Sequence, residues 1–259
     1  MRWRKIDGWL LTAAAFLTVV SILDSLWIPG FMSWLTPATT LLTFSFALLH
    51  AGLRLGWPRA ILMAVVVFII SIGFESVGVL TGAIYGPYHY TDQLGIKFLG
   101  LVPLLIPVAW FMMMYASYVI AGQLIPALPG ANLTRLLVVA ALGGLAMTAW
   151  DLTMDPLMVA AGHWVWNAPG AYFGIPLQNF WGWWLTTFTA LTVYQLLAQV
   201  LVKKQVSKVD LPPLRWVVYA YILIGGSSVI VASIFDLQGP ALSGLFAMLP
   251  WAVVGLLRT

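Results

Sequence analysis

The sequence predicts an all-α fold, a polytopic membrane bundle of about eight transmembrane helices. Of the 259 residues, 62% are hydrophobic and only 8% are charged, and the mean hydropathy is +0.97. A soluble domain of this size carries about a quarter charged residues. The polar stretches are no longer than loops, so we expect residues 1–259 to form a single integral-membrane domain.

Apolar stretches of about 20 residues, the length that spans the hydrocarbon core of a bilayer, recur eight times. The first follows a basic start (MRWRK) and lacks a small-residue cleavage site, so we interpret it as a retained helix. Helix breakers such as Ile28-Pro29-Gly30 and Pro129-Gly130 separate the stretches. The helices are centred near Ala15, Phe46, Val67, Trp110, Leu142, Phe188, Leu223 and Phe246.

The basic residues support this helix count and predict the orientation of the chain in the cell membrane. With eight helices and a cytoplasmic N-terminus, the C-terminus is also cytoplasmic, and Lys97 is the one basic residue on the outer side. Cytoplasmic loops are enriched in Lys and Arg, and a wrong helix count would scatter these charges. The cytoplasmic set is Arg2, Arg4, Lys5, Arg54, Arg59, Arg135, Lys203, Lys204, Lys208, Arg215 and Arg258.

Scarce residue types exclude several kinds of site. The chain has no cysteine, which removes disulfides, thiolate nucleophiles, iron–sulfur clusters and cysteine-ligated zinc. Its three histidines are far apart in the sequence, whereas haem, di-iron and zinc sites use clustered ligands. We therefore expect no metal and no cofactor. The net charge of +4 follows from topology, so we expect no nucleic-acid partner, while membrane lipid is an expected partner.

Three acidic residues, Glu75, Asp151 and Asp155, lie within predicted transmembrane helices, in the outer half of each. A charged side chain at the centre of a bilayer costs roughly 3 kcal/mol or more, so such residues usually face the protein interior and mark a functional site. The alternative is a purely structural role in hydrogen bonding between helices. We treat the three acids as the candidate catalytic residues.

Asp151 and Asp155 are four residues apart, so a helix places them on one face, about 6 Å from each other. Two such acids cannot both ionise easily away from water, which gives a proton donor beside a carboxylate. Pro156 follows and predicts that the helix kinks or ends at Asp155. Small residues flank Glu75, and Gly78 and Gly82 form a GxxxG pattern that allows another helix to approach closely.

Aromatic residues are concentrated in the two outer loops that follow the acids, and in the run NFWGWW that opens the sixth helix. They either line a substrate site or form an ordinary interfacial aromatic belt, and both interpretations stay open. His89 and His163 are interpreted as loop residues without a catalytic role. The candidate substrate-binding residues are Trp150, Trp164, Trp166, Tyr88, Tyr85, Asn179 and Trp183.

These motifs together resemble the carotenoid biosynthesis membrane-protein family, which includes the CruF-type carotenoid 1,2-hydratases and bisanhydrobacterioruberin hydratases. The resemblance covers about residues 70–185, and the outer helices match only in hydropathy. It is carried by Glu75 with its glycines, Tyr85-Gly86-Pro87-Tyr88-His89-Tyr90, Pro107, Trp110, Tyr115, Trp150-Asp151-Leu152-Thr153-Met154-Asp155-Pro156, His163-Trp164-Val165-Trp166, Gly170-Ala171-Tyr172-Phe173-Gly174-Ile175-Pro176, Asn179 and Gly182-Trp183.

The resemblance implies a hydro-lyase that adds water, without a cofactor, to the terminal 1,2 double bond of an acyclic carotenoid end and gives a tertiary alcohol. Family members differ in substrate, which is lycopene, γ-carotene or a C50 carotenoid, and no residue here distinguishes these. Whether one or both ends are hydrated, and the oligomeric state, also stay open.

We assign Asp155 or Asp151 as the proton donor, the other as its electrostatic partner, and Glu75 as the base that orients water. Two other functions are compatible with the acids. A prenyltransferase uses DxxxD to hold magnesium and a diphosphate, but it needs several nearby basic residues. A proton-coupled carrier relays protons through carboxylates, but no internal repeat supports that.

Overall fold

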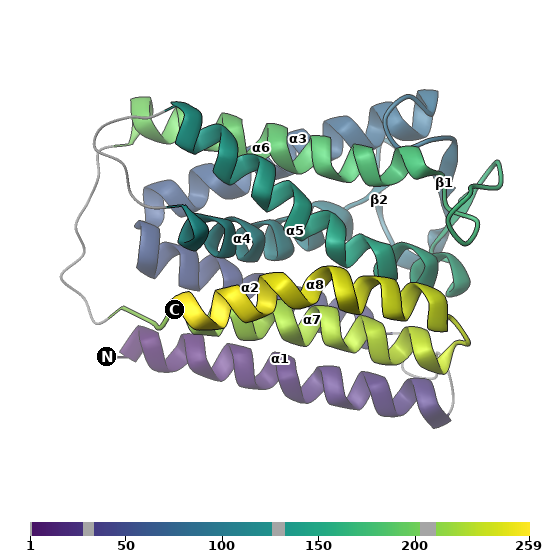
Figure 1. The fold of residues 1–259 in the computed structure, drawn as a ribbon, viewed down its shortest axis with the longest axis horizontal. Helices are drawn as coiled ribbons and strands as arrows, with labels where there is room; N and C mark the ends of the chain where they lie inside the picture. Colours follow the sequence, from purple (N-terminus) through teal and green to yellow (C-terminus); the bar gives the residue numbers. More distant parts are fainter. Residues whose placement is uncertain (1, 28–33, 126–132, 203–210) are drawn as a thin grey trace.

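The computed structural model describes residues 2–27, 34–125, 133–202 and 211–259, and this part of the chain is a bundle of eight long helices (Figure 1). All eight are long and apolar enough to cross a membrane, which confirms the predicted all-α polytopic bundle. Each predicted helix centre lies in one of them. The helices are α1 (Arg2–Trp27), α2 (Leu35–Leu55), α3 (Trp57–Thr81), α4 (Leu105–Leu124), α5 (Leu133–Ala160), α6 (Leu177–Leu201), α7 (Arg215–Ile234) and α8 (Gln238–Arg258).

Helices α4 and α5 form the centre of the bundle, because α5 packs against α4, α6, α7 and α8, and α4 also packs against α2 and α3. Helices α4 and α5 are the most buried of the eight, whereas α1 packs against α2 and α7 at the margin. Figure 1 shows α1 along one side of the bundle. The sequence therefore places Asp151 and Asp155, on α5, in one of the two most buried helices of the bundle.

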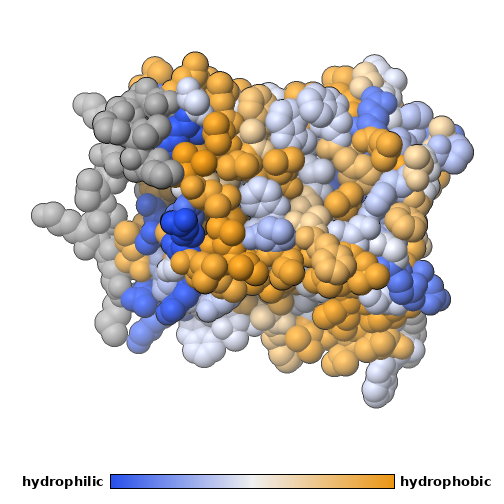
Figure 2. All heavy atoms as spheres, viewed as in Figure 1, coloured by the Kyte–Doolittle hydropathy of each residue, from blue (hydrophilic) through white to orange (hydrophobic). Residues whose placement is uncertain are grey.

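The two ends of the bundle differ in charge and in structure. Helix direction alternates, so every described Arg and Lys except Lys97 lies near the end that holds both chain termini (Figure 1). Figure 2 shows a mainly hydrophobic surface between hydrophilic ends, as a bilayer requires. The predicted breakers at residues 28–30 and 129–130, and Lys203, Lys204 and Lys208, lie outside the described residues.

The opposite end is covered by four short strands, a 3₁₀ turn and irregular loops. Strand β1 (Tyr88–Tyr90) pairs antiparallel with β4 (Trp164–Trp166), and β2 (Lys97–Phe98) pairs with β3 (Val102–Pro103). The turn η1 (Asp92–Leu94) lies between β1 and β2. Successive side chains of a strand point to opposite faces. Tyr88 and Tyr90 are buried accordingly, while His89 is exposed.

The sequence predicts that α5 kinks or ends at Asp155. The helix does not end there, because it continues through Pro156 to Ala160. Proline has no N–H, so the carbonyl of Leu152, four residues earlier, loses its usual helical partner. The Tyr172 hydroxyl donates a hydrogen bond to that carbonyl at 2.9 Å. A side chain from the loop after β4 thus replaces the missing bond, as membrane helices with proline require.

We expect the termini and the β1–β4 end to lie on opposite sides of the membrane, with the termini cytoplasmic. The chain has no cysteine, so single substitutions report on their own position. In intact cells, a membrane-impermeant thiol reagent should label Ile96→Cys, which is 78% exposed, but should label Thr259→Cys only after lysis. Buried Ala116→Cys is the unlabelled control. Labelling of Thr259→Cys in intact cells would show that the chain has the opposite orientation in the membrane.

We also expect Tyr172→Phe to destabilise the protein by about 1–3 kcal/mol, because the Leu152 carbonyl then lacks a partner in a buried helix. In a Pro156→Ala background the alanine N–H can bond that carbonyl, so the same Tyr172→Phe change should cost less. Thermal unfolding in detergent measures all four proteins. Equal costs in the two backgrounds would show that Tyr172 does not compensate for the proline.

Candidate active site

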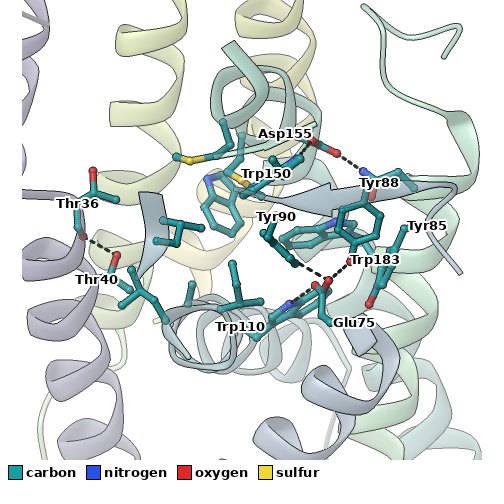
Figure 3. A pocket seen from close by; sticks show the side chains of 18 of the residues that line it. Thr36, Thr40, Glu75, Tyr85, Tyr88, Tyr90, Trp110, Trp150, Asp155 and Trp183 are labelled. Atoms are coloured by element: carbon teal, nitrogen blue, oxygen red, sulfur yellow. Dashed lines mark hydrogen bonds between the residues drawn. The ribbon is translucent and has the colours of Figure 1, made fainter. Parts of the chain in front are cut away.

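A cavity of about 120 Å³ lies inside the bundle, beneath the β1–β4 pair, and is lined mainly by apolar and aromatic side chains (Figure 3). Its walls come from α2, α3, α4, α5, α6, the two strands and η1. A buried water needs roughly 10–15 Å³ of such space, so the cavity has room for several waters or one small apolar group. Two of the three acids, Glu75 and Asp155, line it from different helices.

Glu75 lies near the end of α3 and accepts three hydrogen bonds from neutral side chains. Its Oε1 accepts from the Trp110 indole N–H at 3.0 Å, and its Oε2 accepts from the Tyr90 hydroxyl at 2.9 Å and from the Tyr88 hydroxyl. A carboxylate offers about four acceptor positions in all. Glu75 is only 4% exposed, so these donors take the place of the water that an exposed acid would have.

Tyr88 and Tyr90 remain protonated donors at any working pH. Burial, and then the adjacent charge of Glu75, raise the pKa of both hydroxyls well above the usual value for tyrosine. The two residues are two positions apart on β1. Because alternate side chains of a strand point to the same face, both point toward the same carboxylate. The local sequence Tyr-His-Tyr thus supplies two hydrogen bonds to one acid.

Asn179, at the start of α6, links the two aspartates. Its Nδ2 donates to Asp151 Oδ2 at 2.8 Å and to Asp155 Oδ2 at 2.6 Å, so one amide group uses both hydrogens on the pair. Asp155 Oδ1 accepts from the Trp164 indole at 2.7 Å. Asp151 Oδ1 is buried and has no hydrogen-bond partner among the described residues. The pair therefore shares one face of α5, as its spacing predicts.

The β1–β4 pair carries side chains that hydrogen-bond to the acids on both sides of the site. Strand β1 carries the hydroxyls that bond Glu75 on α3, and Trp164 on β4 bonds Asp155 on α5. In the register, Tyr90 lies opposite Trp164 and Tyr88 opposite Trp166. These four side chains also contact one another in the cavity roof, where the ring centroids of Tyr88 and Trp166 are 5.1 Å apart.

Three tryptophans form an aromatic wall between the acids. Trp110 stacks on Trp183 with ring centroids 4.2 Å apart, and Trp150 meets Trp183 edge-on at 5.9 Å. The indole N–H of Trp150 donates to Ser228 Oγ at 3.1 Å, and that of Trp110 donates to Glu75. Because both N–H groups are held in hydrogen bonds, these rings are fixed in orientation and offer the cavity their apolar surface.

The GxxxG pattern has a different use from the predicted one. Gly78 on α3 and Gly182 on α6 face the ring of Tyr85, and a Cβ at either position would overlap that ring. Tyr85 fills the space between the two helices, and its hydroxyl lies 2.7 Å from Thr186 Oγ1. Gly82 ends α3 in a left-handed conformation with φ of 68°, which glycine adopts without strain.

Nine of the ten predicted site residues line this cavity, and Asp151, one turn before Asp155 on α5, is the exception. Sequence reasoning missed Tyr90 and Trp110, which both bond Glu75. The alternation in Tyr88-His89-Tyr90 was the available indication for Tyr90. The nine residues are Glu75, Asp155, Trp150, Trp164, Trp166, Tyr88, Tyr85, Asn179 and Trp183.

Lys97, His89 and His163 lie outside the cavity, and Lys97 has a structural role there. Lys97 Nζ donates to the Tyr90 carbonyl at 2.8 Å and to Asp92 Oδ1 at 2.7 Å, so it braces β1. This hydrogen bond and the charge of Lys97 lower the pKa of Asp92 below its usual value. His89 is exposed and contacts Asn167, and burial lowers the pKa of His163. Neither histidine lines the cavity.

Comparisons with known proteins point to one family. The model of a family described as "Carotenoid biosynthesis protein" matches residues 35–250, which include the whole cavity. A bisanhydrobacterioruberin hydratase of Haloarcula japonica is 35% identical over 136 residues, which are 52% of this chain and 45% of that protein. The match therefore spans less than half the length of this relative. No solved structure matches the chain.

We expect Asn179→Leu to destabilise the protein by about 1–3 kcal/mol for each carboxyl oxygen left without its donor. Trp181→Leu is the matched control, because Trp181 lies on the same helix but is 58% exposed. Thermal unfolding in detergent should separate the two variants. Unfolding temperatures that agree would show that the amide does not hold the aspartate pair.

Proposed function

Because the chain belongs to the carotenoid biosynthesis protein family, we propose that it is a carotenoid hydratase. It adds water to the terminal 1,2 double bond of an acyclic carotenoid end and gives a tertiary alcohol. The similarity to a protein named as a hydratase supports this function. The observation that carries it is the cavity itself, in which two buried carboxyl groups on different helices face an apolar space walled by indoles.

The reaction makes three demands on a site. An isolated trisubstituted alkene must be protonated at its less substituted carbon, which requires an acid shielded from water. The tertiary cation that results needs negative charge or aromatic faces nearby. A base must then accept a proton from the water that adds. Each of these groups is present among the cavity residues.

We assign the proton donor to Asp155. It lines the cavity, whereas Asp151 does not, and hydrogen bonds from Asn179 and Trp164 fix the position of its carboxyl group. Asp151 acts as a positioning residue through the shared amide of Asn179. With both N–H groups of Asn179 committed to the aspartates, this residue positions the acids, and only its Oδ1 is left to hold a water.

The cation is stabilised by the indole wall and by Glu75. Desolvated cations gain about 2 kcal/mol from the face of a tryptophan. Trp110, Trp150 and Trp183 surround the space between the acids in Figure 3. Glu75 adds a negative charge at the opposite wall from Asp155, where it attracts the cation.

Glu75 also orients the water. Tyr88, Tyr90 and Trp110 occupy three of its four acceptor positions, and the remaining one is on Oε1. A water that donates there presents its oxygen to the cation. The new C–O bond forms, the oxonium loses its proton to Glu75, and water in the cavity returns that proton to Asp155. The sum is alkene plus water giving alcohol, with no cofactor consumed.

Neither alternative function gains support from the site. A magnesium-dependent prenyltransferase needs basic residues near the DxxxD acids to bind its diphosphate. Lys97, the basic residue predicted on this side, is held by Tyr90 and Asp92. A proton-coupled carrier requires no aromatic cavity of this kind. We place the site in the outer half of the cell membrane, from the charge distribution.

Expression in a host that makes lycopene or γ-carotene tests the function directly. We expect a product heavier by one water, formed without oxygen or reductant and insensitive to magnesium. An oxygen requirement would indicate a hydroxylase instead. An unchanged pigment would reject the hydratase function, and uptake by proteoliposomes would then test the carrier.

The assignment of Asp155 predicts that Asp155→Asn lowers turnover by about 10²–10⁴-fold, the usual contribution of a general acid. Glu75→Gln should also lower turnover strongly, because it removes the base and the charge that faces the cation. Asp236→Asn, an exposed acid at the same end of the bundle, is the matched control and should retain activity. Pigment analysis at equal amounts of membrane protein measures all three. Wild-type turnover by Asp155→Asn would refute the assignment.

A further inference from the structure

The cavity has two chemically different ends. Glu75, Asp155 and Asn179 are at most 4% exposed and define a closed polar end. Thr36 and Thr40 of α2 lie at the other end, and Figure 3 shows them on the opposite side of the cavity from Glu75 and Asp155. The indole of Trp150 lies between the two ends. The polar groups of the site are thus confined to one extremity.

The other end is apolar and partly exposed. Leu94 of η1, Leu105 and Ile106 at the start of α4, and Met158 near the end of α5 also line the cavity, and all four are only partly buried. The Thr40 hydroxyl donates to the Thr36 carbonyl at 2.8 Å, so its polar group is satisfied within its own helix. We call the part of the cavity bordered by Thr36, Leu94, Leu105, Ile106 and Met158 the mouth.

The size of the cavity limits what can enter it. A carotenoid is about as long as the hydrocarbon core of a bilayer is thick, roughly 30 Å. A space of about 120 Å³ accepts only the end of such a molecule. The remaining chain has to leave through the end of the cavity that is not closed by the buried acids.

We propose that the mouth is a binding subsite for the conjugated chain of the carotenoid, and that the polar end accepts only the terminal isoprene unit. This inference rests on the proposed hydratase function. It follows that the enzyme binds and hydrates one end of the substrate in each turnover and makes no contact with the far end. A substrate with two acyclic ends is released after the first hydration and must reverse before the second.

Methionine side chains suit this subsite. Met154 and Met158 of α5 and Met112 of α4 line the cavity, and methionine adapts its shape to different apolar surfaces. A conjugated chain is rigid and straight, so the protein has to adjust to it. The three methionines provide that adjustment without adding polar groups along the path.

The first test compares substrates with the unmodified protein. Lycopene has two acyclic ends and γ-carotene has one, with a ring at the other. We expect kcat/KM per acyclic end to agree within about two-fold, and singly hydrated lycopene to accumulate before the doubly hydrated product. A loss of about ten-fold or more with γ-carotene, or no free singly hydrated intermediate, would overturn the inference. Hydration of neither substrate would instead refute the proposed function.

The second test obstructs the mouth. Ile106→Trp should lower kcat/KM for lycopene by about ten-fold or more, because the larger side chain fills the mouth. Leu41→Trp is the control, because Leu41 lies on α2 but is 50% exposed and does not line the cavity. Thr36→Trp provides a second obstruction if Ile106→Trp is not inserted in the membrane. Wild-type turnover by a correctly inserted obstructed variant would contradict the subsite.

Discussion

The structure of the site depends on supplying hydrogen-bond donors to the three acids, Glu75, Asp151 and Asp155, that are buried near the β1–β4 end of the bundle. An acid without partners is expensive at this depth, and the neighbouring helices offer mostly methyl and methylene groups. The donors instead come from indole, phenol and amide groups, which carry no charge. Glu75 receives three of them, and Asn179 serves both aspartates. The aromatic residues that stabilise the fold are therefore the same residues that surround the proposed reaction.

Sequence reasoning predicted the helices and the acids because both depend on strong local properties. Hydropathy locates a membrane helix, and the four-residue spacing of Asp151 and Asp155 places them on one face of it. The β1–β4 pair was not predicted, because strands of three residues have little pattern of their own and their partners are 74 to 78 positions apart in the sequence. The same limit applies to Trp110, whose contact with Glu75 depends on how α3 and α4 pack.

Pro156 shows how a local rule fails when a distant group intervenes. Proline should weaken the helix at Asp155, and the freed Leu152 carbonyl confirms the local part of that reasoning. Tyr172 lies 20 residues further along and restores the bond, so the helix continues for another turn. The aspartate consequently stays on a regular helix, where Asn179 and Trp164 can both reach it.

The short sequence distances within the site have a consequence for assembly during synthesis. Tyr88 and Tyr90 follow Glu75 by 13 and 15 residues, and Trp164 follows Asp155 by nine. As α3 and α5 are inserted, the segment that emerges directly after each already contains a donor for Glu75 or Asp155, whereas the donor of Asp151 is Asn179 on α6. The nascent chain can therefore reduce the energetic penalty of Glu75, and later that of Asp155, before the next helix has been translated. Pairing of β1 with β4 then joins two halves that have matured separately.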